Sequence, residues 1–274
     1  MTSRDLPSLL HVDAHVHIYD AFDIDAMCAV ALQRSAELRG PLLLLLSESD
    51  GFAYFDRLEG WAREGSVRAH GLRLEPTLEP ESLALRAGDS APSVFWIAGR
   101  QLVSAEGLEI LALAWRPAPH SELRSGQPAA ALVRGLVDAG ALGVLPWGVG
   151  KWLGHRAALV DALVSDTYLR GHSHFFVGDI AHRCWPWPTP RAFRQGVRVL
   201  AGTDLLPLAG LERDVAAFGS RIEGSLDPRT PAASLRRALA TRGSASSYGR
   251  AKSPLRMLAE QLRYRQSRRA ARHA

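Results

Sequence analysis

The segment that decides the fold reads Leu9-Leu10-His11-Val12-Asp13-Ala14-His15-Val16-His17. Its apolar and polar residues alternate, and this alternation is typical of a β-strand. Side chains two apart on a strand point to the same face, so we expect Asp13, His15 and His17 on one face, with both histidines at the carboxyl end of the strand. Two adjacent neutral imidazoles can each offer a ring nitrogen to a divalent cation. The alternative is a pair of half-buried histidines that bond to backbone groups.

The residues that follow predict a parallel strand, helix and strand unit. Asp23 can cap a helix over residues 24–38, whose apolar positions recur at helical spacing and which Gly40 and Pro41 end. Leu42–Leu46 is an unbroken apolar run, the pattern of a strand that is covered on both faces. Such a unit is the building block of a parallel α/β fold.

Further strands are expected along the chain. They are predicted at residues 67–74, 94–103, 108–114, 142–145, 174–177 and 197–201, with helices at 128–139 and 191–195. After Asp204 only helix signals are present, around residues 211–218 and 232–240. A count of about seven or eight strands favours a closed barrel, and 274 residues is an ordinary length for one. The expected fold class is α/β, a distorted (β/α)7-8 TIM-like barrel.

The charge distribution suggests two parts of unequal size. Residues 1–245 are expected to form a single metal-binding barrel domain, and residues 246–274 a basic helical tail. Eight of the 33 Lys and Arg residues follow position 249 with a single acid, so the rest of the chain carries a slight excess of acid despite the net charge of +5. This argues against nucleic-acid binding by the body and leaves it open for the tail. The alternative is a helix whose arginines face solvent.

The sequence also predicts a cytoplasmic location. Cys28 and Cys184 are too few for a disulfide framework. Residues 1–7 contain no apolar core of signal-peptide length, and no apolar run approaches the roughly 18 residues of a membrane span.

A carboxylate ends the last predicted strand. The apolar residues 197–201 lead directly into Gly202-Thr203-Asp204. In a closed barrel the last strand lies beside the first, so Asp204 is expected next to His15 and His17. There it can bind a metal ion or accept a proton from water that the metal has made more acidic. The alternative is an N-cap for the segment that follows.

Three other charged residues are candidates for the site. Asp179 ends a predicted strand and is expected at the same mouth, and Arg183 can bind an anion such as phosphate or carboxylate. Lys151 is one of only two lysines in the chain, which suggests chemistry that arginine cannot perform, such as carbamylation or proton transfer. A salt bridge or cap at Asp179 and Arg183, and a plain surface role for Lys151, stay open.

A run of tryptophan and proline also stands out. Trp185-Pro186-Trp187-Pro188-Thr189-Pro190 cannot be helix interior or central strand, because proline lacks the backbone donor and fixes φ. The stiff loop can wall a pocket beside Trp147 and Trp152, or it can be packing of a connector.

Several of these motifs together resemble the PHP phosphoesterase family over residues 10–243. The resemblance rests on Asp13-Ala14-His15-Val16-His17, on residues 97–101 and 107–113, on Ala201-Gly202-Thr203-Asp204 and on Leu235-Arg236-Arg237-Ala238-Leu239. It implies a distorted seven-stranded β/α barrel with a site of two or three metals that acts on phosphoesters. The order of the last three predicted strands agrees with this family.

The chain departs from the family pattern at four places. Ser47-Glu48-Ser49-Asp50 stands where the family has Asp-His, Gln101 where it has a ligating Glu, Leu145-Pro146-Trp147 where it has Ala-His-Pro, and Leu206 where it has the closing His. Only His15, His17 and Asp204 carry over, so we expect one or two metals.

The leading hypothesis is a metal-dependent hydrolase of phosphoesters or another anionic substrate. The expected metal ligands are His15, His17, Asp179 and Asp204, the expected catalytic residues are Asp204, Lys151 and Arg183, and the expected cofactor is one or two ions of Zn, Mn or Fe. The expected partner is a small anionic or polar molecule. Two alternatives remain: a C–N bond hydrolase resembling the amidohydrolase superfamily, and a barrel that has lost catalysis and serves as a binding or scaffold module through its basic tail.

Overall fold

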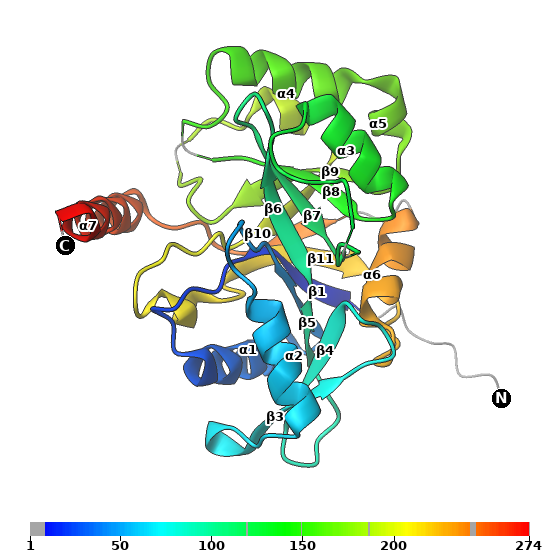
Figure 1. Cartoon of the computed structure of the whole chain (residues 1–274), viewed down its shortest axis with the longest axis vertical. Helices are drawn as coiled ribbons and strands as arrows, with labels where there is room; N and C mark the ends of the chain where they lie inside the picture. Colours follow the sequence, from blue (N-terminus) through cyan, green and yellow to red (C-terminus); the bar gives the residue numbers. More distant parts are fainter. Residues whose placement is uncertain (1–8, 119, 149, 186, 242–244, 274) are drawn as a thin grey trace.

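The computed structural model describes residues 9–118, 120–148, 150–185, 187–241 and 245–273 (Figure 1). It is an α/β protein with two mixed sheets that face each other. Parts of several features named above lie outside the described residues, among them the amino-terminal residues 1–8, Pro186 within the tryptophan and proline run, and residues 242–244 near the end of the predicted barrel domain.

The larger sheet has seven described strands with β1 near its centre. Their order is β12 (Ser246–Gly249), β11 (Phe218–Glu223), β1 (Leu9–Val16), β2 (Leu42–Leu46), β5 (Val94–Ile97), β4 (Ser82–Ala87) and β3 (Leu72–Pro76). β1 pairs in parallel with β2, as the strand, helix and strand pattern predicts, and antiparallel with β11. The central strands β1 and β2 are almost entirely buried, which explains why β2 is an unbroken run of leucines.

The smaller sheet has five described strands. Their order is β10 (Arg198–Gly202), β9 (Phe175–Ile180), β8 (Leu142–Pro146), β7 (Glu109–Leu113) and β6 (Gly99–Val103). The strands β8, β9 and β10 are parallel to one another, whereas β6 and β7 are antiparallel to their neighbours. The parallel strands β8, β9 and β10 therefore end on the same side of this sheet.

The two sheets do not close into a barrel, so the expected closed (β/α)7-8 barrel is wrong. The edge strand β10 lies beside β1 without a ladder, and β6 meets the residues after β2 through an isolated bridge between Glu48 and Arg100. The predicted strand over residues 94–103 explains the break, because it is divided at Ala98: β5 belongs to the larger sheet and β6 to the smaller. Gly99 allows this crossing, since a Cβ there would lie 2.3 Å from the carbonyl oxygen of Leu46.

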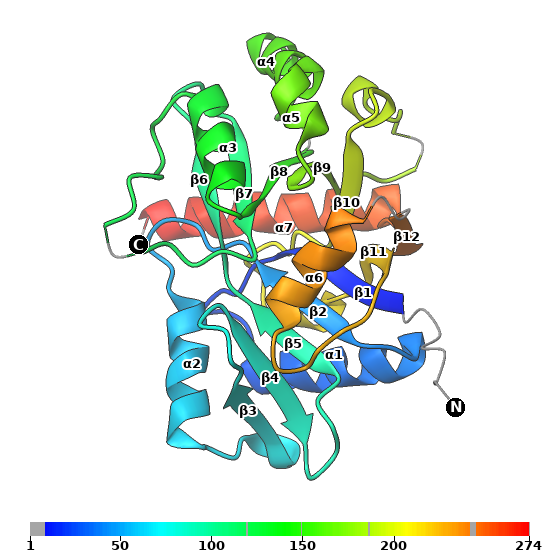
Figure 2. The same cartoon turned by 90° about the vertical axis from the view of Figure 1, so that its right-hand side faces the viewer.

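Helices cover the outer faces of both sheets. The described helices are α1 (Ile24–Leu38), α2 (Tyr54–Glu64), α3 (Ala129–Asp138), α4 (His155–Ser165), α5 (Thr167–Gly171), α6 (Pro231–Ala240) and α7 (Pro254–His273), with 3₁₀ turns at Ala69–Gly71, Arg191–Arg194 and Leu211–Asp214. Figures 1 and 2 show α1 and α2 against the larger sheet and α3, α4 and α5 against the smaller one. Each outer layer has its own apolar core, and a third core lies between the sheets and is closed at one end by α6.

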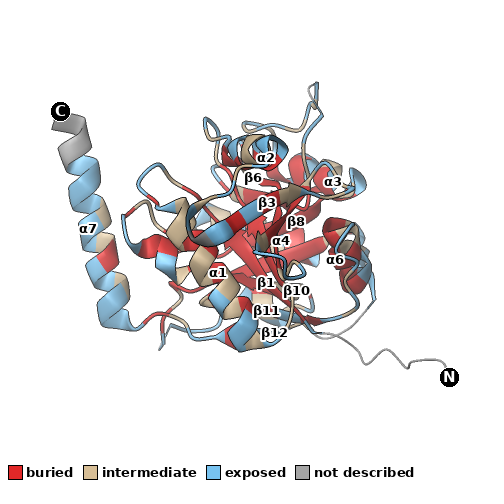
Figure 3. Cartoon of the chain, turned by 90° about the horizontal axis from the view of Figure 1, so that it is seen from below, coloured by how far each residue is buried: buried red, intermediate tan, exposed pale blue. Residues whose placement is uncertain are grey.

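The chain after residue 245 takes part in both the sheet and the surface. Residues Ser246–Gly249 form β12, which pairs with β11, and α7 lies on the side of the molecule opposite α6 (Figures 1 and 2). Most of α7 is exposed, with a buried position at Glu260 (Figure 3). The division of the chain at residue 245 stays a prediction.

No described helix is long and apolar enough to cross a membrane. The cytoplasmic location stays a prediction.

Candidate metal centre

Three side chains meet where β1 and β10 end. His15 lies on β1, His17 directly follows it, and Asp204 comes two residues after β10. The two Nε2 atoms of the histidines are 3.0 Å apart, and Asp204 Oδ1 lies 3.5 Å from His15 Nε2 and 3.6 Å from His17 Nε2. Both histidines are buried and Asp204 is largely so. The neighbourhood of Asp204 and the two histidines, which the sequence predicts, is therefore present in the fold.

The backbone holds Asp204 against β1. A Cβ at Gly202 would lie 2.3 Å from the backbone nitrogen of His15, so only glycine lets β10 approach β1 this closely. Asp204 has φ 48°, in the left-handed region that aspartate tolerates better than most residues. Its N–H donates to the carbonyl oxygen of His15 at 2.9 Å. The sequence Gly-Thr-Asp is thus suited to the sharp turn that brings the carboxylate to the histidines.

Asp13 stabilises the same turn through hydrogen bonds. Its fully buried carboxylate accepts hydrogen bonds from Thr203 Oγ1 (2.6 Å), from the Thr203 N–H (2.8 Å) and from the Ala216 N–H (2.9 Å). Burial raises the pKa of Asp13 to about 6, although these hydrogen bonds act in the opposite direction. The register of β1 against β2 shifts between Asp13 and Val16. Asp13, which was expected to share a face with the histidines, is accordingly a residue that positions β10.

The electrostatics of the three residues suit a divalent cation. Burial lowers the pKa of His15, against the effect of Asp204, and burial together with His15 lowers the pKa of His17 to about 4. Burial alone would raise the pKa of Asp204, but the neighbouring His15, Lys151 and His17 hold it below its usual range. The group therefore offers two neutral imidazoles and one carboxylate, and metal binding requires these forms of the ligands.

The distances fit a metal as well as the charges do. Ligand atoms about 2.0–2.1 Å from a tetrahedral Zn²⁺ lie about 3.3 Å from one another. The three observed separations, 3.0, 3.5 and 3.6 Å, bracket that value. Two imidazoles and a carboxylate can also bind iron or manganese, so the donor set does not identify the metal.

This group borders a cavity of about 630 Å³. Its lining comes from strand ends, from the loop after β10 and from α7: His17, Tyr19, Ser49, Phe52, Gln101, Glu109, Gly148, Lys151, Ile180, His182, Asp204, Leu205, Leu206, Pro207, Gln261, Tyr264, Arg265 and Arg268. The volume lies within the range of ordinary ligand sites.

Lys151 reaches the same cavity, where it pairs with an acid. Its Nζ lies 2.5 Å from Glu109 Oε2. Burial lowers the pKa of Lys151, but the negative charges of Asp204 and Glu109 outweigh that effect and raise it above its usual value. Lys151 therefore stays protonated, and a protonated amine can bind an anion but cannot act as a nucleophile.

The helix α7 forms one wall of the cavity through Gln261, Tyr264, Arg265 and Arg268. Neither arginine takes part in an ion pair with another described residue, although the Arg268 guanidinium lies over the Tyr264 ring, 5.8 Å from its centroid. The basic tail, residues 246–274, thus contributes two cationic side chains to the cavity beside the histidines.

A buried ionic group anchors α7. Glu260 interacts with His182 Nε2 at 3.1 Å and accepts from Lys252 Nζ at 2.5 Å and from Arg256 Nε at 2.9 Å. Burial would raise the pKa of Glu260, but the hydrogen bonds with His182 and Lys252 outweigh it and lower the pKa to about 2. Since His182 also lines the cavity, Glu260 couples the helix to the wall of the site.

Asp179 and Arg183 lie apart from the three potential ligands. Arg183 donates to both carboxylate oxygens of Asp179, at 2.6 Å through Nε and 2.5 Å through Nη2, and the Ile180 N–H also donates to this carboxylate. Within the described residues, the group whose ligand atoms all lie within 4.8 Å of one another consists of His15, His17 and Asp204. The structure therefore brings Lys151 to the site. Asp179 and Arg183 form a salt bridge with each other, which is the alternative that the sequence left open for them.

Sequence reasoning missed several residues of the cavity. His182 comes two residues after β9, so its place just beyond a strand end was a usable signal. Glu109 begins β7 and gives no comparable signal, because its role depends on Lys151. Gln101, which departs from the PHP pattern, lines the cavity and acts against the lowering of the His15 pKa by burial.

No model of a known protein family matches the chain, and no curated protein matches it. Among solved structures, PsfC from Pseudomonas syringae PB-5123 superposes with a TM-score of 0.56 at 18% sequence identity, over 95% of this chain and 99% of that one. The chain therefore shares the fold of PsfC. The resemblance to the PHP family remains a prediction from the residues.

Endonuclease Q gives two further matches. The lesion-specific enzyme from Pyrococcus furiosus has a TM-score of 0.46 at 14% identity, covering 87% of this chain and 57% of that chain. Endonuclease Q in complex with a 27-mer duplex substrate that carries an abasic lesion has a TM-score of 0.47 at 13% identity, covering 88% and 60%. This chain spans about three fifths of either one.

The second of these matches corrects one expectation. The sequence predicted a small anionic or polar molecule as partner, whereas the matched Endonuclease Q holds a 27-mer duplex. The small-molecule partner is therefore not retained.

Proposed function

We propose that this protein is a metal-dependent hydrolase of phosphoesters. The observation that carries the proposal is the position of His15, His17 and Asp204 beside a cavity that also contains cationic side chains of α7. A metal site alone is compatible with many reactions, but one that faces cations favours an anionic substrate. The resemblance of Asp13–His17 and of residues 201–204 to the PHP phosphoesterases supports the same reaction.

The metal would be held by His15, His17 and Asp204. Three protein ligands leave coordination positions free for water and substrate, as in catalytic zinc sites. When bound, a divalent cation supplies Lewis-acid chemistry that polarises the phosphoryl group and makes water a stronger acid. The other candidate donors in the cavity, Glu109 and His182, are already paired with Lys151 and Glu260, so we propose one ion.

The cationic side chains would bind the phosphoryl oxygens. Lys151 stays protonated in the cavity, and its ion pair with Glu109 fixes the position of the ammonium group. Arg265 and Arg268 face the cavity from α7 with no carboxylate partner among the described residues. Arginine binds phosphate through paired, charge-assisted hydrogen bonds, so these two side chains suit the anion.

Hydrolysis needs one proton relay. The oxygen of water forms the new bond to phosphorus while the ester P–O bond breaks, and a proton of that water ends on the leaving oxygen. Asp204 stays ionised because His15, Lys151 and His17 lower its pKa. A carboxylate with a lowered pKa is a weak base, so we propose that Asp204 orients the attacking water as a hydrogen-bond acceptor. No observation favours C–N bond hydrolysis through a carbamylated Lys151, because that lysine stays protonated.

An assay with chromogenic phosphoesters tests the proposal. Bis(4-nitrophenyl) phosphate and 4-nitrophenyl phosphate are incubated with metal-free protein and with protein that has received Zn²⁺, Mn²⁺ or Fe²⁺. We expect nitrophenol release that depends on metal, and a loss of at least about a hundredfold in kcat for His17→Ala. The matched control is His155→Ala, an exposed histidine at the start of α4.

Two outcomes contradict the proposal. One is an absence of metal-dependent release from either ester under any of the three metals. The other is a His17→Ala protein that is as active as His155→Ala, because the activity would then not depend on the proposed ligands.

A further inference from the structure

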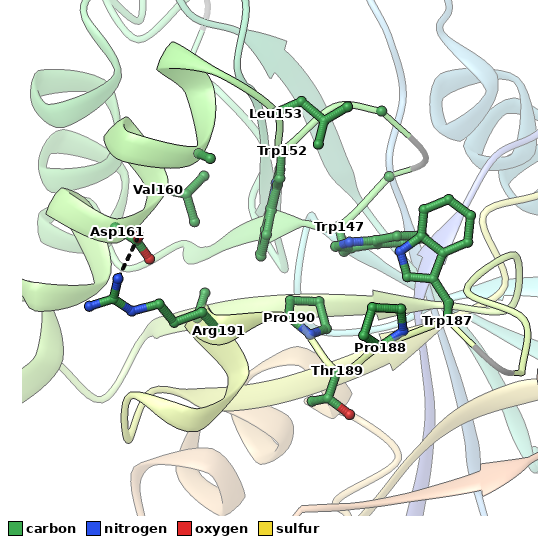
Figure 4. A pocket seen from close by; sticks show the side chains of 14 residues that line it. Trp147, Trp152, Leu153, Val160, Asp161, Trp187, Pro188, Thr189, Pro190 and Arg191 are labelled. Atoms are coloured by element: carbon green, nitrogen blue, oxygen red, sulfur yellow. Dashed lines mark ion pairs between the residues drawn. The ribbon is translucent and has the colours of Figure 1, made fainter.

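A second cavity, of about 550 Å³, lies on the smaller sheet side of the molecule. Its walls are mostly aromatic rings and prolines, namely Trp147, Trp152, Trp187, Pro188 and Pro190 (Figure 4). The rings of Trp147 and Trp187 meet edge to face, with centroids 5.5 Å apart and an interplanar angle of 72°. Residues 187–190 of the tryptophan and proline run therefore form a wall of this cavity. We refer to this space as the aromatic cavity.

The aromatic cavity adjoins the cavity at the metal centre. Gly148, which follows β8, lines both of them. A Cβ at Gly148 would lie 2.4 Å from Lys151 Cδ, so glycine leaves room there for the lysine that reaches the metal centre. The two cavities therefore meet at this residue.

The lining of the aromatic cavity determines what it can hold. Its charged members, Asp161 and Arg191, pair with each other at 3.7 Å (Figure 4). The remaining lining is apolar apart from the indole N–H groups and Thr189. An uncharged planar ring would stack on the indoles.

We propose that the aromatic cavity binds a planar aromatic group of the phosphoester whose phosphoryl group lies at His15, His17 and Asp204. This inference rests on the proposed function and adds the chemical class of the group that the ester carries. Indole walls select flat, polarisable rings over flexible aliphatic chains, because stacking contributes beyond the burial of area. Esters without such a ring leave the aromatic cavity empty and bind more weakly.

The test uses ring binding that requires no turnover. Metal-free protein is titrated with 4-fluorophenol and, separately, with 4-fluorophenyl phosphate, and binding is followed by the ¹⁹F chemical shift. Trp187→Ala is the test variant, since this side chain is 40% exposed and its loss leaves the buried core intact. Trp185→Ala is the matched control, because Trp185 is 82% exposed and does not line the aromatic cavity.

We expect Trp187→Ala to weaken the binding of both fluorinated probes roughly tenfold, equivalent to about 1.4 kcal/mol, and Trp185→Ala to leave it unchanged. Equal affinities in wild type and Trp187→Ala, or an equal loss in Trp185→Ala, would overturn the inference.

The controls separate this inference from the proposed function. Hydrolysis of phosphoesters with no change of probe binding or KM in Trp187→Ala would overturn the inference and leave the function standing. Ring binding that Trp187→Ala weakens, in a protein that hydrolyses no phosphoester, supports the aromatic cavity as a ring site and removes the function.

Discussion

Replacing Glu260 with glutamine would remove the charge that holds α7 against the cavity. In the folded protein this carboxylate is 4% exposed and interacts with His182, Lys252 and Arg256 at 3.1, 2.5 and 2.9 Å. Glutamine has nearly the same shape, so the substitution tests the charge rather than the packing. It also leaves Lys252 buried without its nearest acid.

The magnitude follows from the pKa of Glu260. Its interactions with His182 and Lys252, which outweigh burial, lower it from 4.5 to about 2. Each unit of such a shift corresponds to about 1.4 kcal/mol, so the carboxylate contributes on the order of 3 kcal/mol to the free energy of unfolding at neutral pH. Because the folded-state pKa is depressed, this contribution is fully present above pH 4.5 and is lost as the pH falls toward 2.

Urea unfolding of wild type and Glu260→Gln between pH 2.5 and 7 checks both the size and the sign. We expect a difference of about 3 kcal/mol at pH 7 that shrinks steadily below pH 4.5. The exposed Glu37→Gln serves as the control and should change stability by less than about 0.5 kcal/mol at any pH. A Glu260→Gln difference below about 1 kcal/mol at pH 7, or one that does not vary with pH, would refute the reasoning.

Three further substitutions test other parts of the account. Gly202→Ala should lower stability by more than about 2 kcal/mol in thermal or urea unfolding, because the new Cβ would lie 2.3 Å from the His15 nitrogen; a neutral effect contradicts the close approach. Thr203→Val removes a donor to the buried Asp13 and should cost about 1–3 kcal/mol at pH 7. Burial raises the pKa of Asp13 to about 6, so ionisation of Asp13 costs folding free energy as the pH rises through that value. The loss of stability in Thr203→Val should therefore be smaller at pH 5 than at pH 7. An equal loss at both pH values would contradict the role of Thr203 as a donor to the ionised Asp13. Arg265→Ala should weaken competitive inhibition by inorganic phosphate severalfold while urea unfolding stays within about 0.5 kcal/mol; unchanged inhibition removes Arg265 from the anion site.

The group of His15, His17 and Asp204 could be predicted because its signals are local. The alternation of residues 9–17 is sufficient to identify β1, and the apolar run before Gly202 identifies β10. Both strand ends carry their ligands within two residues, so placing the strands also places His17 and Asp204. The helix predicted over residues 24–38 is confirmed as α1 for the same reason, since its cap and its apolar spacing lie within the segment itself.

Elements that depend on distant partners were missed. The helix signal over residues 211–218 corresponds to a 3₁₀ turn, and the strand β11 begins at Phe218. β11 pairs with β1, about two hundred residues earlier in the chain, and Gly219 lies where a Cβ would be 2.3 Å from the carbonyl oxygen of Val12. No local pattern reports such a pairing, because tertiary contacts override the propensity of a short segment.

The tail shows the same limit. Its apolar and basic spacing predicts a helix, and α7 is one. This spacing does not predict the contact of Glu260 with His182, because His182 lies almost eighty positions earlier in the chain. The charge count therefore separated the tail from the body, whereas the three-dimensional contacts make Arg265 and Arg268 part of the cavity.

The binding of Zn²⁺ to metal-free protein, measured against a competing chelator, tests the central claim most directly. We expect about one tight equivalent for wild type and for His155→Ala, and a loss of affinity of at least about a hundredfold for His17→Ala and for Asp204→Asn. A wild type that binds no metal, or His17→Ala and Asp204→Asn proteins that bind it as tightly as wild type, would contradict the claim that His15, His17 and Asp204 form a metal centre.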